Sequence, residues 1–255
     1  MIRSSNFFLS VCSAILLLSS CVGKAPLYIK GKVKLTFRNM VSGSPMALNT
    51  SVYTNPFAET YTISKFKYYI SNVKLGLSGV PTTATDKDGY HLVDQSLPES
   101  LSFSFEADEG SFVTLSFLIG VDSIRNVSGA QTGALDPLKD MFWTWNSGYI
   151  MAKMEGTSPQ SNQAGNKIEY HIGGFSGANN ALRYVSSIYP NGKTVAIRSG
   201  QTSEIILEAD FNKWWQTPND IKIKDLPVCT TPGVLAIKVA DNYSDMFRIV
   251  DVVNH

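Results

Sequence analysis

The run from Tyr61 to Leu77 constrains the fold more than any other part of the sequence. It is long and rich in aromatic and β-branched residues, which favour strands. Its side chains alternate between two faces, with Tyr68 and Ile70 on one face and Tyr69 and Ser71 on the other. A two-residue period is the geometry of a strand. The run therefore predicts one long strand, and the rest of the chain must supply the strands that pair with it.

Shorter segments of the same character recur along the chain and are separated by turn residues. They are residues 28–37, 47–53, 90–94, 168–173, 184–189, 194–199, 204–211 and 234–240. Segments 101–107 and 112–119 flank Ala107-Asp108-Glu109-Gly110, whose length and composition are typical of a hairpin turn. The recurrence of short strands favours an all-β fold, an antiparallel β-sandwich or barrel with long loops, one of them over residues 120–140.

Helical structure is expected only as one or two short turns. Phe211, Trp214 and Trp215 have the spacing i, i+3 and i+4, so Asp210 is expected to cap a single turn whose apolar side docks on the core. A second turn is possible within residues 241–247.

The N-terminus has the features of a bacterial lipoprotein signal. The apolar run Phe7–Leu18 follows Arg3 and is too short for a permanent membrane anchor. Leu18-Ser19-Ser20-Cys21 has the form of a lipobox, which predicts cleavage before Cys21 and lipidation of its sulfur. The alternative is an ordinary secretory signal cut near Ser20. The predicted organisation is a signal peptide over 1–20, a lipidated cysteine and tether over 21–26, and a single β domain over 27–255.

Charge and cysteine usage restrict the partners of the mature chain. Removing Arg3 leaves 21 basic residues (22 minus 1) against 21 acidic ones, with no basic run, which argues against binding nucleic acid. Val22 is not the acidic residue that retains lipoproteins at the inner membrane, so an outer-membrane location is expected, periplasm-facing or surface-exposed. Cys229 would be the one remaining thiol, so no disulfide is expected, and a buried, inert cysteine is the favoured interpretation.

No enzyme motif is present: the sequence lacks G-x-S-x-G, H-E-x-x-H and C-x-x-C. We therefore expect a protein without catalytic activity. Asp122, Asp136 and Asp140 fall within one loop and could hold calcium, although their spacing fits no EF-hand. Solvated turn aspartates are the simpler interpretation.

Residues Asp140–Gly156 contain two of the four tryptophans and three of the seven methionines. If Phe142–Met154 is extended, Trp143 and Trp145 share one face about 6.5–7 Å apart, and His171 on a second strand could complete a site for copper(I), a soft ion. An intact indole nitrogen has no free lone pair, so tryptophan could ligate only after oxidative ring opening to kynurenine.

Two further interpretations of this stretch remain open. It could be a packed aromatic strand, or a surface on which a sugar or peptide stacks. Strand parity places Met141 and Met151 on the tryptophan face and Met154 on the opposite one.

The sequence resembles the MbnP-like copper-binding proteins, whose relatives include MopE and CorA of methanotrophs. The segments that carry the resemblance are Tyr69–Val73, Gly120-Val121-Asp122-Ser123, Gly133–Pro137, Met141–Gly156, Tyr170–Gly174 and Asn242–Phe247. Within them, W-x-W-x-x-G-Y-x-x-x-K-x-E-G is the most specific pattern.

The resemblance implies a secreted or surface-attached β-rich protein that binds copper(I) through histidine and a kynurenine made from tryptophan. A di-haem peroxidase-like (MbnH-type) partner would perform the oxidation. The modified residue would be Trp143 and the imidazole His171. Trp145 stands where a copper-binding relative has a second histidine, and Phe37-Arg38-Asn39 lacks a histidine that some relatives carry. The ligand set is thus one imidazole short, with His91 and the thioethers of Met141, Met151 and Met154 left to complete it.

Overall fold

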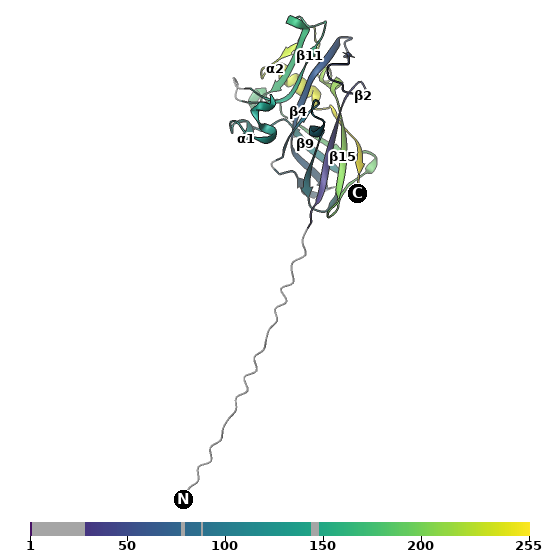
Figure 1. The fold of residues 1–255 in the computed structure, drawn as a ribbon, viewed down its shortest axis with the longest axis vertical. Helices are drawn as coiled ribbons and strands as arrows, with labels where there is room; N and C mark the ends of the chain where they lie inside the picture. Colours follow the sequence, from purple (N-terminus) through teal and green to yellow (C-terminus); the bar gives the residue numbers. More distant parts are fainter. Residues whose placement is uncertain (2–28, 78–79, 88, 144–147) are drawn as a thin grey trace.

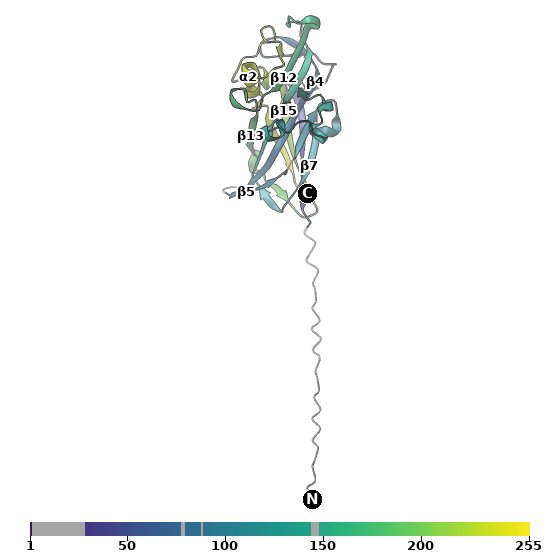
Figure 2. The same ribbon diagram turned by 90° about the vertical axis from the view of Figure 1, so that its left-hand side faces the viewer.

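The computed structural model describes Met1 and residues 29–77, 80–87, 89–143 and 148–255. Apart from Met1, the predicted signal peptide lies outside these residues, as does Cys21. In the described part of the chain, the strands form two large sheets and a two-stranded ribbon. Figures 1 and 2 show an elongated β structure in which the larger sheet curls as a half-barrel over the smaller one, with few short helices. The predicted all-β class is confirmed.

The smaller sheet has five strands and is built on the N-terminal strand. Its order is β17 (Phe247–Val253), β15 (Thr202–Asp210), β1 (Gly31–Val41) and β2 (Ser44–Pro45), and β7 (Ser102–Ala107) also pairs with β1. β1 and β15 run parallel, because the chain passes through the other sheet between them. The sheet is therefore mixed, which the prediction of an antiparallel fold did not include.

The larger sheet has ten strands and is built on the long strand predicted over residues 61–77. Its order is β13 (Arg183–Ile188), β9 (Thr114–Ile119), β4 (Thr60–Leu77), β11 (Gly148–Thr157), β12 (Lys167–Gly173) and β16 (Val228–Cys229). Four more strands pair with it: β3 (Tyr53–Thr54), β5 (Val80–Thr85), β6 (Tyr90–Asp94) and β10 (Phe142–Trp143). The ribbon joins β8 (Gly110–Phe112) and β14 (Val195–Ile197).

Helical segments in the described residues are short. The two α-helices are α1 (Ser123–Asn126) and α2 (Val234–Tyr243). The 3-10 turns are Pro98–Leu101, Gly133–Leu135, Pro137–Lys139, Ala164–Asn166, Gly177–Asn179, Pro190–Gly192 and Phe211–Trp214. Within this part of the chain, no helix has both the length and the apolar composition needed to cross a bilayer.

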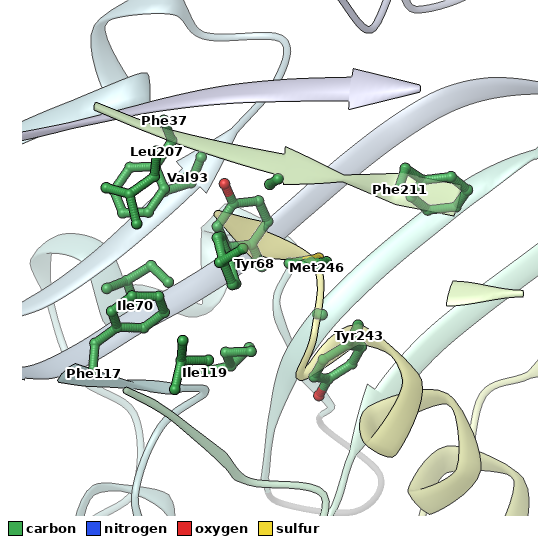
Figure 3. Packing of buried hydrophobic residues seen from close by; sticks show 14 of the residues in the cluster. Phe37, Tyr68, Ile70, Val93, Phe117, Ile119, Leu207, Phe211, Tyr243 and Met246 are labelled. Carbon is green, nitrogen blue, oxygen red and sulfur yellow. The ribbon is translucent and has the colours of Figure 1, made fainter. Parts of the chain in front are cut away.

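The main core lies between the two sheets. Figure 3 shows Phe37 and Leu207 of the smaller sheet facing Tyr68, Ile70 and Phe117 of the larger one. The Phe37 ring meets the Tyr68 ring edge-on, with centroids 6.1 Å apart. Burying such apolar surface is the main favourable contribution to folding, so the two inner faces determine how the sheets pack.

The predicted capped turn after β15 is confirmed. The Asp210 carboxylate accepts a hydrogen bond from the backbone N–H of Asn212 at 3.0 Å. Phe211, Trp214 and Trp215 are each at most 1% exposed and pack in the main core. Both of these tryptophans are therefore core residues.

Two predicted strands differ from the structure near the ends of the chain. Residues 234–240 were expected to be a strand, but they belong to α2, and the chain is extended again only in β17. The buried positions Ala236, Val239, Ala240 and Tyr243 recur at helical spacing, which outweighs the β propensity of the valines. The strand expected over 47–53 is reduced to β3.

The hairpin predicted over residues 101–119 is also wrong. β7 pairs with β1 in the smaller sheet, whereas β9 pairs with β4 and β13 in the larger sheet. The chain therefore changes sheets between Ala107 and Thr114. Turn-forming residues predict that the chain reverses direction, but they do not determine with which strand each flanking segment pairs.

Phe142–Met154 is not one strand. β10 and β11 run antiparallel, with Phe142 opposite Tyr149 and Trp143 opposite Gly148. Trp145 lies outside the described residues.

Candidate functional site

A second, smaller apolar cluster lies on the face of the larger sheet opposite the main core. We call it the outer cluster; its buried members are Tyr69, Val121, Leu135, Met141, Trp143, Tyr149, Ile150 and Met151. Tyr69 reaches it because its neighbours Tyr68 and Ile70 on β4 face the main core. In Figure 1, the segment with α1 lies on the side of β4 away from β15. The predicted loop over 120–140 therefore covers a core of its own.

A close backbone approach fixes one side of the outer cluster. The Gly120 N–H donates to the Tyr69 carbonyl at 3.0 Å, and the Gly120 carbonyl accepts from the Ser71 hydroxyl at 2.7 Å. A Cβ at Gly120 would lie 2.8 Å from the Met151 sulfur, so only glycine fits. The next N–H, that of Val121, donates to the same sulfur at 3.2 Å. Met151 is thereby held with its sulfur inside the cluster.

Trp143 lies across the end of β12. Trp143 is 6% exposed, and a Cβ at Gly173 would lie 2.4 Å from Cζ3 of the Trp143 ring. The absence of a side chain at Gly173 thus makes room for the indole. His171 is two residues from Gly173 on the same strand, so its Cβ lies on the same face at about 6.5–7 Å along the strand. The structure therefore brings Trp143 and His171 to neighbouring positions on the outer face.

A small pocket borders the indole. Its volume is about 230 Å³ and its lining includes Trp143, Tyr149, Gly174, Phe175 and Pro232. The Gly174 backbone has a φ of +114°, and a Cβ there would lie 1.9 Å from the Asn179 carbonyl oxygen, which explains the second glycine of the Gly173-Gly174 pair. The mostly buried Trp143 thus borders a cavity of limited size.

His171 faces outward because its strand neighbours Tyr170 and Ile172 face the main core. Its Nε2 lies 3.0 Å from Oε1 of Glu155. The hydrogen bond with His171 is the largest cause that lowers the pKa of Glu155 to about 2; burial opposes this shift, and Lys65 reinforces it. Glu155 is therefore a carboxylate at neutral pH.

Two lysines complete a network of charged groups on this face. Lys153, 2% exposed, stands opposite His171 in register, and its Nζ lies 3.0 Å from Oδ1 of Asp140 and donates to the Asp140 carbonyl. Lys65 Nζ lies 2.7 Å from Oδ2 of Asp140 and 3.2 Å from Oε2 of Glu155. We call these five residues, Lys65, Asp140, Lys153, Glu155 and His171, the outer charge network. It links the residue before Met141 to the strands that carry Glu155 and His171.

Burial and ion pairing shift the pKa values of Lys153 and Asp140 in opposite directions. Burial lowers the pKa of Lys153, and Asp140 counteracts the shift. Burial also opposes ionisation of Asp140, but hydrogen bonds from Lys65 and Lys153 bring the pKa of that carboxyl below its usual value. The ion pair between Lys153 and Asp140 therefore keeps both side chains charged despite their partial burial.

Sequence reasoning missed Lys65, Lys153, Glu155 and Gly173 as parts of the site. One signal was present. Lys153 and Glu155 are charged residues at alternate positions of an otherwise apolar strand, which indicates a polar partner on one face. The identity of that partner depends on the register between β11 and β12.

His91 faces the other side of the larger sheet. It stands opposite Ile70, whose side chain is in the main core, and directly opposed residues share a face. Its Nε2 lies 2.6 Å from Oδ2 of Asp86, and its ring stacks on Phe103 with centroids 3.4 Å apart. The sheet therefore separates His91 from His171.

The methionines divide between the two faces as predicted, although the prediction assumed one continuous strand and β10 and β11 are separate. Met141 and Met151 are fully buried in the outer cluster with Trp143, whereas Met154 is in the main core. Met151 and Met141 are thus the thioethers on the side of Trp143.

The three loop aspartates have separate structural roles. The Asp122 carboxylate caps α1 by accepting from the Arg125 N–H at 3.2 Å, and its other oxygen accepts from the Tyr90 hydroxyl at 2.5 Å. Asp136 caps the Pro137–Lys139 turn, and Asp140 belongs to the outer charge network. Among the residues that the structure describes, no three His, Cys, Asp or Glu side chains form a group that could hold a metal ion. The three aspartates are therefore engaged as turn and ion-pair residues.

Cys229 is a buried free cysteine on β16. Burial raises the pKa of its thiol to about 12. Because the thiolate is the reactive form, the predicted inert character agrees with its surroundings.

A model of the MbnP family matches residues 30–231. The chain belongs to the MbnP family. The match includes β1, the outer cluster, Trp143 and His171, so the predicted family is confirmed.

The fold is also similar to a solved structure, MbnP from Methylosinus trichosporium. The similarity has a TM-score of 0.51 at 14% sequence identity and covers 74% of this chain and 78% of that chain. At such low identity the likeness supports the fold alone. No curated protein matches the sequence.

Proposed function

We propose that this MbnP-family protein is a lipid-anchored, extracytoplasmic copper-binding protein that takes part in copper handling without catalytic turnover of its own. Copper(I) would bind on the outer face of the larger sheet, through the His171 imidazole and a kynurenine derived from Trp143. The observation that carries the proposal is the placement of the Trp143 indole over Gly173, two residues from His171.

The side chains around Trp143 suit a soft cation. Imidazole and thioether groups match copper(I) better than hard cations, and Met141 and Met151 share the outer cluster with Trp143. Met151 already accepts the Val121 N–H. Since His91 lies on the opposite face, His171 is the imidazole available there, and the aniline nitrogen of kynurenine would supply the second nitrogen.

The chemistry of ring opening is defined by the bonds that change. Cleavage of the indole C2–C3 bond adds one oxygen atom to each carbon and gives N-formylkynurenine. Hydrolysis then releases formate and leaves a free aromatic amine. A di-haem peroxidase-like partner would carry out the oxidation, with hydrogen peroxide supplying the oxygen atoms and being reduced to water. Trp143 lines a pocket at the border of the outer cluster, and the oxidant would reach the residue from there.

The pocket argues against the alternative of a stacking site for a sugar or peptide. Its volume of about 230 Å³ is below the range of roughly 300–1,000 Å³ that is usual for small-molecule sites. Trp143 is 6% exposed and offers little ring surface for stacking.

Membrane attachment would come from the lipobox. We propose that Cys21 is lipidated after removal of residues 1–20, and that Val22 permits sorting to the outer membrane. In cells labelled with a radioactive fatty acid, the wild-type protein should carry label in the outer-membrane fraction and Cys21→Ala should carry none. Label on Cys21→Ala, or its absence from the wild type, would contradict this part of the proposal.

Copper(I) titration tests the site directly. We expect protein co-produced with its oxidising partner to bind copper(I), His171→Ala to lose most of the affinity, and the matched control His91→Ala to retain it. Peptide mass spectrometry of the same samples should show kynurenine at position 143. Equal binding by His171→Ala and the wild type would rule out the metal role of His171.

A further inference from the structure

We propose that Glu155 is the positioning residue of the copper site: it holds Nε2–H of His171, so that Nδ1 is the atom that ligates copper. This inference rests on the proposed function and assigns a role to the K-x-E part of the family pattern, which that function leaves unused. Glu155 would not touch the metal.

The hydrogen bond between the two side chains has only one possible direction. A carboxylate has no proton to donate, so at the 3.0 Å separation from Oε1 the Nε2 atom of His171 must carry the hydrogen. A neutral imidazole with its proton on Nε2 has its lone pair on Nδ1. Which nitrogen binds a metal is determined by the hydrogen bond that the other one makes.

The strand register places Glu155 and Trp143 towards opposite ends of β12 relative to His171. Glu155 stands opposite Glu169, which precedes His171 on β12, whereas the Trp143 indole lies over Gly173, which follows it. Nε2 is engaged on the Glu155 side. In the proposed site, Nδ1 is then the ring nitrogen left to ligate copper on the Trp143 side of His171.

Lys65 and Lys153 keep this arrangement in place. Lys65 bridges Glu155 and Asp140, with Nζ at 3.2 Å and 2.7 Å from their carboxylates. Lys153, buried between β4 and β12, holds the carboxylate and carbonyl of Asp140. Since Asp140 directly precedes Met141 and β10, the same network fixes the strand that carries Trp143 and the residue that orients His171. Mutation of a residue that hydrogen-bonds to a metal ligand often lowers the metal affinity by about 10- to 100-fold.

Nuclear magnetic resonance of the imidazole tests the inference in the wild-type protein. With ¹⁵N-histidine labelling, metal-free protein should show a slowly exchanging Nε2–H for His171. Addition of copper(I), which is diamagnetic, should shift the Nδ1 resonance and leave Nε2 protonated. A shift at Nε2, or a proton on Nδ1 in the metal-free protein, would overturn the proposal.

Variants provide the second measurement. Glu155→Ala should lose the slowly exchanging Nε2–H and bind copper(I) about 10- to 100-fold more weakly. The matched control Glu169→Ala removes a carboxylate from the same row of the sheet, one strand away from Glu155, and should leave both readouts unchanged. Circular dichroism establishes that both variants fold.

The outcomes separate this inference from the proposed function. If the wild type binds no copper(I), both fail. If His171→Ala abolishes binding while Glu155→Ala binds as tightly as the wild type, the copper site stands and the positioning role of Glu155 is wrong.

Discussion

At the scale of single residues, the packing of Trp143 on the outer face depends on the absence of a side chain at Gly173. Any side chain there would occupy the space of the Trp143 ring, since an added Cβ would lie 2.4 Å from Cζ3 and 2.6 Å from Cη2. Real Cβ atoms do not tolerate such contacts, so the indole or the strand would have to move. The position of Trp143 beside His171 is therefore set by a glycine on a neighbouring strand.

Gly173→Ala tests this dependence. Overpacking of this kind typically costs about 1–3 kcal/mol, so the free energy of unfolding in urea should fall by that amount and the tryptophan fluorescence should change. Gly192→Ala is the control, because Gly192 has a φ of +66° and open space around it. It should cost about 1 kcal/mol through its backbone and leave the fluorescence unchanged. Unchanged fluorescence in Gly173→Ala would contradict the packing.

Sequence reasoning selected Trp143, His171 and Met151 because their residue types are rare or soft. It could not select Glu155 or Lys153, since a charged strand residue is ordinary until the neighbouring strand is known. Their roles follow from the register that sets Lys153 opposite His171. Trp145, the other tryptophan of the predicted pair, was placed by assuming a continuous strand, and the antiparallel pairing of β10 and β11 removes that assumption.

Cys229 gives a prediction that depends on pH. Burial raises the pKa of its thiol to about 12, above the ordinary value of roughly 8.5. The buried thiol therefore contributes stability that is complete below the ordinary pKa and is lost as the pH rises towards 12. With Cys12 and Cys21 replaced by serine, the folded protein should not react with a thiol reagent at pH 8, and the denatured protein should react at once. Fast reaction of the folded protein would contradict the burial.

At the scale of elements, alternation identified strands well where both faces have fixed neighbours. β4 and β6 are close to their predicted limits because their alternate residues face the main core and the outer side. α2 was missed because its valines, leucine and isoleucine are common in strands, and a short apolar segment does not by itself distinguish a strand from a helix. The prediction of a hairpin at 101–119 was wrong because the pairing of a strand depends on the packing of the whole sheet and not only on the adjacent turn.

Asn242 fixes α2 to the turn after β15. Its side-chain amide donates to the Trp214 carbonyl at 3.0 Å and the Asn219 carbonyl at 2.7 Å, and its oxygen accepts from the Asn219 N–H at 2.9 Å. Each buried group left unsatisfied costs about 1–3 kcal/mol, so Asn242→Ala should lower the free energy of unfolding by at least that amount. Exposed Lys238→Ala should change it by less than about 0.5 kcal/mol. Urea denaturation of the two variants measures the difference, and equal midpoints would contradict the role of Asn242.

At the scale of the whole molecule, the larger sheet has a core on each face. The main core joins it to the smaller sheet, and the outer cluster joins it to the segment that carries α1 and β10. The all-β class followed from the sequence because alternation and turns are local. The second core could not be predicted in the same way, because a loop that covers a sheet face has no regular alternation of apolar and polar residues. The proposed copper site lies on the face of the larger sheet that carries this second core, away from the contact between the sheets.

Buried tyrosines in both cores predict how the molecule unfolds in alkali. Burial raises the pKa of Tyr68, Tyr69, Tyr170 and Tyr243 above the usual value near 10. Between the ordinary and the raised pKa, the unfolded chain binds fewer protons than the native protein, so stability falls as the pH rises above about 10. Tyrosinate absorbance and circular dichroism followed together should therefore change in one transition at high pH. Ionisation of these tyrosines near pH 10 with the β-sheet signal intact would show that the two cores admit solvent.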